Sequence, residues 1–164
     1  MVATVDSLAI SVAGFEDLSA IEPAWWRLLN DQQELDRRGS ITELRSLQNA
    51  ERVRRFTETR VRQGRFVIAR LEGELVGIST IAPDGFLLES QVPIWEIADV
   101  WVEPHARRQG IATAMVRQCE HECKMRGAVE VRLTVYAGND AGLNLYRHLG
   151  YDVSSHTLAR KLEE

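Results

Sequence analysis

The sequence predicts an α/β fold with a central mixed sheet and helices on both of its faces. Residues 95–136 form an apolar strand, a loop, an amphipathic helix and an alternating strand, which predicts a right-handed parallel crossover. The runs Arg65–Arg70 and Leu75–Ile81 flank a Glu72-Gly73 turn, which is typical of a β-hairpin. The length of 164 residues and the apolar content of 45% suit one domain, residues 1–164, with its own core.

In the N-terminal half, a strand over Leu8–Val12 is expected to precede two helices. Pro23 predicts that the first helix begins near Ala24, because proline is favoured in the first helical turn, and Gly39-Ser40 is expected to end it. The second helix is expected to start at Thr42 and to stop before Gly64. Its many arginines are interpreted as a solvated face rather than as a rim that attracts an anionic substrate. Phe86–Pro93 is expected to be a loop or a ragged strand.

The C-terminal half continues the alternation of strands and helices. A helix is predicted over Ile111–Arg126, followed by a strand over Val129–Val135 whose apolar and polar residues alternate. Asn139 or Asp140 is expected to cap a short helix that ends before Gly150. Two final strands, Tyr151–Val153 and Thr157–Leu162, are expected to form a hairpin.

Composition excludes several classes of protein. The net charge of −4 argues against general nucleic-acid binding, and no apolar run is long enough to span a bilayer. The N-terminus lacks the features of a secretion signal, so a cytoplasmic location is expected. Cys119 and Cys123 lie four residues apart in a predicted helix and should share a packed face rather than form a disulfide. His121 would point away from them, so we expect no metal site.

The loop between the crossover strand and its helix has the properties of a phosphate site. Pro104 ends the strand over Ile97–Val102, and the N–H groups at the start of the next helix attract anions. Arg107 and Arg108 add positive charge, and Gly110 lets the backbone approach a ligand closely. Neither the P-loop string nor the three-glycine dinucleotide fingerprint is present.

The loop instead matches the pattern [RQ]-x-x-G-x-[GA] through Arg107, Gly110 and Ala112. This pattern resembles the acyl-CoA loop of the GCN5-related N-acetyltransferase (GNAT) superfamily. A second stretch, residues 133–151, resembles the GNAT strand that is followed by Asn, a helix with Leu-Tyr, and Gly-[Phe/Tyr]. Here these are Asn139, Leu145-Tyr146 and Gly150-Tyr151. The two motifs stand in the family's order, and the resemblance covers nearly the whole chain, so it implies the GNAT acyl-CoA N-acyltransferase fold.

The resemblance implies a role for each matching position. Backbone groups of Val100, Trp101 and Val102 would pair with the pantetheine arm of acetyl-CoA. The pyrophosphate would be held by Arg107 and by backbone N–H groups of the next six residues: Arg108, Gln109, Gly110, Ile111, Ala112 and Thr113. Asn139 would hydrogen-bond the cofactor arm, although it is also a plausible helix cap. Tyr146 would act as general acid at the thioester sulfur, the alternative being a core tyrosine.

Glu96 is the candidate base, because some family members carry a catalytic Glu on this strand. Strand alternation places Glu96 on the side of Ala98 and Val100 and turns Asp99 the other way, so only one of the two acids is expected to face the cleft. Other members have an acid where this chain has Thr134. The base is therefore Glu96, or a water held by backbone carbonyls; a plain strand-edge charge is the alternative interpretation of Glu96.

The resemblance implies transfer of an acetyl group from acetyl-CoA to a primary amine of a small molecule or protein, by direct attack in a ternary complex. The alternative is an acyl-CoA-binding sensor or interaction module without turnover. An aminoglycoside, a polyamine, an amino acid and a protein amine all remain possible acceptors, and a homodimer remains possible. Trp26 and Phe86 are candidates to line the acceptor pocket.

Overall fold

The computed structural model describes residues 7–35, 50–84 and 92–158. The strands are β1 (Leu8–Val12), β2 (Phe66–Leu71), β3 (Glu74–Pro83), β4 (Ile94–Val102) and β5 (Glu130–Leu133). The α-helices are α1 (Leu18–Leu35), α3 (Ala50–Arg62), α4 (Ile111–Met125) and α5 (Asp140–His148), with short 3-10 turns at η1 (Phe15–Asp17) and η2 (Pro104–Ala106).

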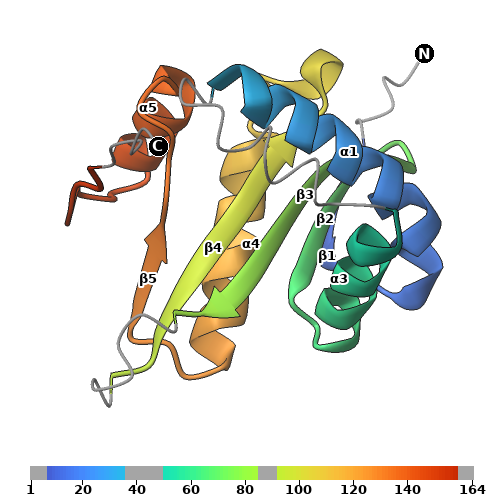
Figure 1. The fold of residues 1–164 in the computed structure, drawn as a ribbon, viewed down its shortest axis with the longest axis horizontal. Coiled ribbons are helices and arrows are strands. Elements are labelled where there is room, and N and C mark those ends of the chain that lie inside the picture. The colour runs from blue at the N-terminus through green and yellow to red at the C-terminus, as the bar shows by residue number, and fades with distance from the viewer. Residues whose placement is uncertain (1–6, 36–49, 85–91, 159–164) are drawn as a thin grey trace, which may run out of the picture.

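The five strands form one mixed sheet in the order β1-β2-β3-β4-β5 (Figure 1). All neighbours are antiparallel except β4 and β5, which are parallel and joined through α4, so the predicted crossover is confirmed. The predicted hairpin is β2–β3. Its turn residues Glu72 and Gly73 have φ of 51° and 89°, as a type I′ turn requires.

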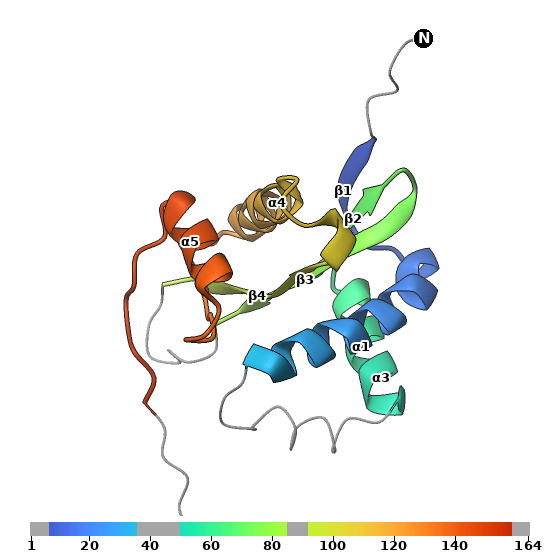
Figure 2. The ribbon, with the colours of Figure 1, turned by 90° about the horizontal axis from the view of Figure 1, so that it is seen from above.

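Helices cover both faces of the sheet, as the sequence predicts (Figure 2). One layer is α1 with α3, whose buried Trp25 and Val53 pack with Phe66 and Trp101 of the sheet. The other layer is α4 with α5. The apolar face predicted for α4 is buried there, and Cys119 and Cys123 are free thiols within it.

The first helix begins earlier than the sequence predicts. It starts at Leu18 and contains Pro23, so the expectation of a start near Ala24 is wrong. The preceding 3-10 turn is closed by Asp17, whose Oδ2 accepts the Gly14 N–H at 2.8 Å. Burial of Ile21 in the following turn adds apolar stabilisation that offsets part of the cost of the hydrogen bond lost at proline. The predicted boundary between the first two helices, residues 39–42, lies outside the described residues.

The predicted strand Tyr151–Val153 is also wrong, since residues 151–158 contain no strand. The Tyr151 hydroxyl donates to Glu120 Oε1 of α4 at 2.7 Å, so this segment is fixed against a helix rather than along a sheet edge. Most of the predicted strand Thr157–Leu162 and of the segment Phe86–Pro93 lies outside the described residues.

A β-bulge in β4 changes which side chains share a face. Thr80 pairs with Ala98 but Ile78 pairs with Trp101, so two residues of β4, Asp99 and Val100, stand opposite Ser79. Asp99 takes the left-handed φ of 58° that such an insertion needs. Beyond this point the alternation is reversed.

The bulge therefore corrects the expected orientation of the two acids. Val100 packs with Trp95 and Ile97 on the α4 side of the sheet. Asp99 hydrogen-bonds Gln32 of α1, so it lies on the α1 side, the side that Glu96 also takes. The expectation that Glu96 and Asp99 face opposite ways is wrong. No helix within the described ranges is both long and apolar enough to cross a membrane.

Candidate active site

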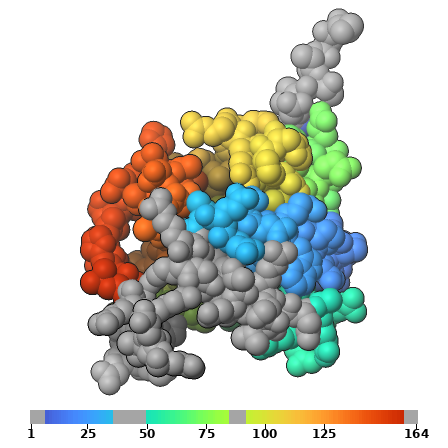
Figure 3. Space-filling view, turned by 45° about the horizontal axis from the view of Figure 1, so that its top comes forward, coloured from blue at the N-terminus to red at the C-terminus, as the bar shows by residue number. Residues whose placement is uncertain are grey.

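A pocket of about 660 Å³ opens where β4 and β5 separate. The two strands pair only from Ile94↔Glu130 to Ile97↔Leu133, so beyond Ile97 the β5-facing edge of β4 has no strand beside it. The end of α1, the loop before α4 and the start of α5 meet around this opening (Figure 3). The volume lies in the range of small-molecule and cofactor sites, about 300–1,000 Å³.

The pocket brings together the two sequence motifs, which are separated along the chain. All of the predicted site residues line it except Glu96 and Gln109. The predicted residues that do so are Val100, Trp101, Val102, Arg107, Arg108, Gly110, Ile111, Ala112, Thr113, Asn139 and Tyr146. The Gln109 side chain instead donates to the His105 carbonyl at 3.3 Å, which leaves only its backbone for the predicted role.

The loop before α4 has a backbone conformation that suits an anion. Arg108 and Gly110 both take left-handed φ values, 64° and 79°, and such turns direct N–H groups into a concave site. The N–H of Ala114 donates to the Gly110 carbonyl, so the N–H groups of Ile111, Ala112 and Thr113 precede the regular helical bonds of α4. Free N–H groups at the positive end of a helix dipole fit the pyrophosphate of coenzyme A.

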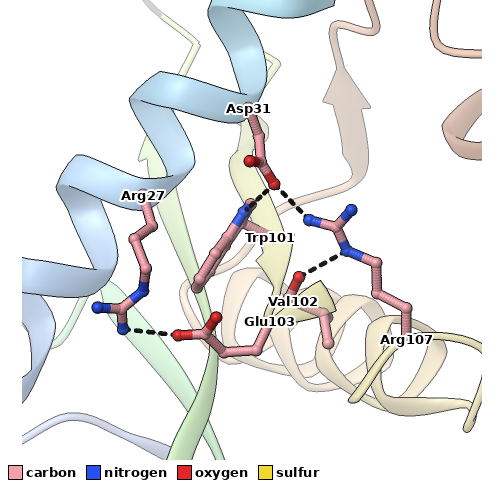
Figure 4. A network of polar contacts seen from close by, with 6 residues as sticks. All are labelled: Arg27, Asp31, Trp101, Val102, Glu103 and Arg107. Carbon is pink, nitrogen blue, oxygen red and sulfur yellow. Dashed lines mark hydrogen bonds and ion pairs between the residues drawn. The ribbon is translucent and has the colours of Figure 1, made fainter. Parts of the chain in front are cut away.

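Arg107 is turned toward α1 rather than toward the start of α4 (Figure 4). Its Nε donates to the Val102 carbonyl at 2.8 Å, and another guanidinium nitrogen contacts Asp31 Oδ2. The same Asp31 oxygen accepts the Trp101 indole N–H at 2.9 Å. The predicted contact of Arg107 with phosphate therefore stays a prediction, and Asp31 is a pocket residue that the sequence analysis missed.

Asn139 caps α5, since its Oδ1 accepts the Gly142 N–H at 2.9 Å. This confirms the predicted cap. Asn139 also lines the pocket, so its position allows the predicted contact with a cofactor arm.

Tyr146 projects from α5 and is buried, with 9% of its surface exposed. Its ring packs edge-to-face on Tyr151, with the ring centroids 6.0 Å apart. Burial disfavours the phenolate, and together with the nearby Cys119 thiol raises the pKa of Tyr146 to about 12. The hydroxyl thus remains protonated near neutral pH and can donate a proton. Among the described residues we find no hydrogen-bond partner for it.

The two acids of β4 differ in their access to the pocket. Asp99 lines it, and its Oδ2 accepts the Thr80 hydroxyl at 3.0 Å. Burial raises the pKa of Asp99. Glu96 does not line the pocket. Its carboxyl is hydrogen-bonded to the side chain of Thr134, and Thr134 does line the pocket. Burial, together with the charges of Asp84 and Asp99, raises the pKa of Glu96 as well.

In the described part of the chain, no group of three or more His, Cys, Asp or Glu side chains is placed to bind a metal ion. Cys119 and Cys123 are buried and His121 is exposed. Trp26 is partly buried against the core cluster of α1, α3 and the sheet and does not line the pocket, and Phe86 lies outside the described residues.

Comparison with known proteins agrees with this geometry. The model of the Acetyltransferase (GNAT) family matches residues 23–151, which include both motifs and the whole pocket. The chain belongs to this GNAT family. An acetyltransferase of Pectobacterium atrosepticum is 31% identical over 100 residues, which is 60% of this chain and 66%, just under two thirds, of that relative.

Solved structures share the GNAT fold over almost the whole chain. Aminoglycoside N-acetyltransferase AAC(6')-Iy, solved in complex with CoA, superposes with a TM-score of 0.73 at 13% identity and covers 99% of each chain. A predicted acetyltransferase from Clostridium acetobutylicum, solved with acetyl-CoA, gives a TM-score of 0.69 at 19% identity, and the match covers 94% of this chain and 96% of that chain. The predicted GNAT fold is thereby confirmed.

Proposed function

We propose that this GNAT protein transfers an acetyl group from acetyl-CoA to a primary amine of a small molecule or protein, by direct attack in a ternary complex. One observation carries the proposal: a single pocket combines a free strand edge, a helix start with unpaired N–H groups, a protonated tyrosine and an acid. A thioester, its nucleotide and an attacking amine need these four features together.

The cofactor would enter through the opening between β4 and β5. Main-chain groups of Val100 to Val102 lie on the part of β4 that β5 does not pair, so an extended pantetheine arm can bond there as an added strand. The pyrophosphate would then reach the backbone N–H groups of Arg108 to Thr113. Asn139, on the other side of the pocket, would hydrogen-bond the arm.

The acceptor amine arrives protonated, because a lysine-like amine has a pKa of about 10.4. A carboxylate must therefore take a proton before attack, directly or through water. Asp99 lines the pocket itself, whereas Glu96 reaches it only through the Thr134 hydroxyl. We therefore propose that Asp99 is the acid in closest contact with the amine and takes its proton. The alternative route, which the sequence predicts, has Glu96 accept the proton through water.

The free amine then attacks the thioester carbonyl, and its electron pair forms the new C–N bond. Main-chain N–H groups beside the bulge, near Val100, would stabilise the oxyanion; loss of one such donor typically costs about 3 kcal/mol. The C–S bond breaks, and Tyr146 would protonate the leaving thiolate. The nitrogen of the new amide would lose its remaining extra proton, which restores the Tyr146 hydroxyl. A thiol pKa of about 8.5 means that this protonation helps moderately rather than decisively.

Two measurements test the proposal. Thermal shift with acetyl-CoA and with CoA tests binding, and thiol release on adding an amine panel tests turnover. The panel contains an aminoglycoside, spermidine, free amino acids and a peptide with a free N-terminus. Binding of acetyl-CoA with amine-dependent thiol release would support the transferase. Binding without release for any amine would support a non-catalytic acyl-CoA-binding module, and absence of binding would refute both.

A further inference from the structure

One carboxylate connects three elements at the edge of the pocket (Figure 4). Asp31, near the C-terminal end of α1, accepts the Trp101 indole N–H from β4 at 2.9 Å and contacts the Arg107 guanidinium of the loop before α4. Arg107 also donates to the Val102 carbonyl at 2.8 Å. The pocket is lined by all three residues, Asp31, Trp101 and Arg107. Helix α1 therefore meets the loop before α4 at this point.

We propose that Asp31 and Arg107 are positioning residues that couple cofactor binding to the acceptor side of the site, an inference that rests on the proposed transferase function. We call the Asp31–Arg107 pair, with its contact to Trp101, the α1 brace. The planar guanidinium of this loop residue bonds the last carbonyl of β4 and a carboxylate of α1 at once, so it holds the loop, the strand end and α1 in one arrangement. Ordering of the loop by CoA is thereby transmitted to the end of α1.

In the brace, Arg107 has a structural role that differs from the phosphate contact that the sequence predicts. If Arg107 acted mainly on phosphate, removing the Asp31 carboxylate would free its charge and remove a nearby negative charge. Asp31→Asn would then leave CoA binding unchanged or make it tighter. If Arg107 acts through the brace, Asp31→Asn and Arg107→Gln have the same effect, because each removes the same contact. Asparagine keeps an oxygen that can accept the Trp101 N–H.

A second ion pair supplies a matched control. Arg27 and Glu103, 2.6 Å apart, join the same helix to the end of the same strand, one helical turn from Asp31. Neither residue is among the described residues that line the pocket. Arg27→Gln therefore removes an ion pair between α1 and the end of β4, together with a cation–π contact at 5.8 Å from the Trp101 ring centroid. It keeps the Asp31–Arg107 contact and the hydrogen bond from the Trp101 indole N–H to Asp31.

The test is hydrogen exchange of residues 28–35, measured with and without coenzyme A. In the wild type and in Arg27→Gln, CoA should slow exchange of this segment about fivefold or more; in Asp31→Asn and Arg107→Gln, by less than about twofold. With the amine that the panel identifies, the two brace variants should raise the acceptor KM about fivefold and leave the acetyl-CoA KM within about twofold. The double variant should be no worse than the poorer single variant.

Two results with the variants would overturn the brace, and two results with the wild type would do so as well. The first is a loss of CoA affinity of about tenfold in Arg107→Gln together with equal or tighter binding in Asp31→Asn, which would make Arg107 a phosphate ligand. The second is an equal response of Arg27→Gln. A wild type that turns over an amine while CoA leaves exchange of residues 28–35 unchanged refutes the brace alone. A wild type that does not bind CoA refutes the proposed function and the brace together.

Discussion

Replacement of Tyr146 by phenylalanine should separate activity from stability. The change removes one hydroxyl, for which the described part of the structure offers no hydrogen-bond partner, and it keeps the ring that packs on Tyr151. Leaving a buried hydroxyl unpartnered costs about 1–3 kcal/mol, so its removal should leave the free energy of unfolding unchanged or higher. In the proposed role of general acid, however, Tyr146 would stabilise the leaving thiolate. We expect kcat to fall by about 10–1,000-fold, or about 1.4–4 kcal/mol.

Tyr151→Phe is the matched control, because Tyr151 has the opposite properties. Its hydroxyl donates to Glu120 Oε1 at 2.7 Å, and it does not line the pocket. Loss of a hydrogen bond to a charged group costs about 1.5–3 kcal/mol. For a domain of this size we expect Tm to fall by about 3–12 °C with little change in kcat.

The assays are thiol release at saturating acetyl-CoA and amine, and thermal unfolding of both variants without ligand. The pKa of about 12 for Tyr146 adds a second check, since the wild-type rate should not decline because of this phenol below about pH 10. Full activity of Tyr146→Phe would refute the acid role. A clear fall in its Tm would show that the hydroxyl is a satisfied structural group.

Five further substitutions test the two acids, the loop before α4 and the core. Because the pKa values of Asp99 and Glu96 are both raised, activity should decline as pH falls through values above the ordinary carboxyl range. Asp99→Asn should lower kcat/KM by about 100-fold and abolish this decline, whereas Glu96→Gln should cost less than about tenfold; the reverse ranking would return the base to Glu96. Gly110→Ala, at φ 79°, should raise the Kd for CoA about tenfold, but Gly73→Ala, at φ 89° in a distant turn, should not change it. Gly77→Ala would bring a methyl group within 2.7 Å of a buried methionine sulfur and should lower the free energy of unfolding by about 1–3 kcal/mol, measured by urea denaturation.

The family and the fold could be predicted, and most residues predicted to bind the cofactor line one pocket, because their signals are local. Gly110 and Ala112 lie in the connection between one strand and the helix that follows it. Asn139 caps the short helix that carries Tyr146. In both cases the separation of the residues along the chain largely determines their separation in the structure. The acceptor side has no such signal. Asp31 enters the pocket only because α1 crosses the end of β4, which is a tertiary contact.

The orientation of Asp99 was predicted wrongly, although the strand does contain a signal. The buried and partly buried residues on the α4 side are Trp95, Ile97, Val100 and Val102, so their spacing is two, three and two. A break from two to three in an otherwise alternating strand indicates an inserted residue, here the acid at φ 58°. Strict alternation would place the charge of Asp99 on the same face as the apolar Ile97 and Trp101. This mismatch in the sequence indicates that the alternation is interrupted.

Because β4 and β5 share hydrogen bonds at one end only, their other end is joined through core side chains of α4 and α5 that pack with both strands, not through the hydrogen-bond ladder. A ligand arm that bonds the free edge of β4 would act as a missing strand and complete the sheet. Because the ligand would bind the folded chain and not the unfolded one, binding raises stability: ligand at 100 times its Kd adds about 2.7 kcal/mol to the free energy of unfolding. Without ligand, this end of the sheet should be where the folded chain first opens.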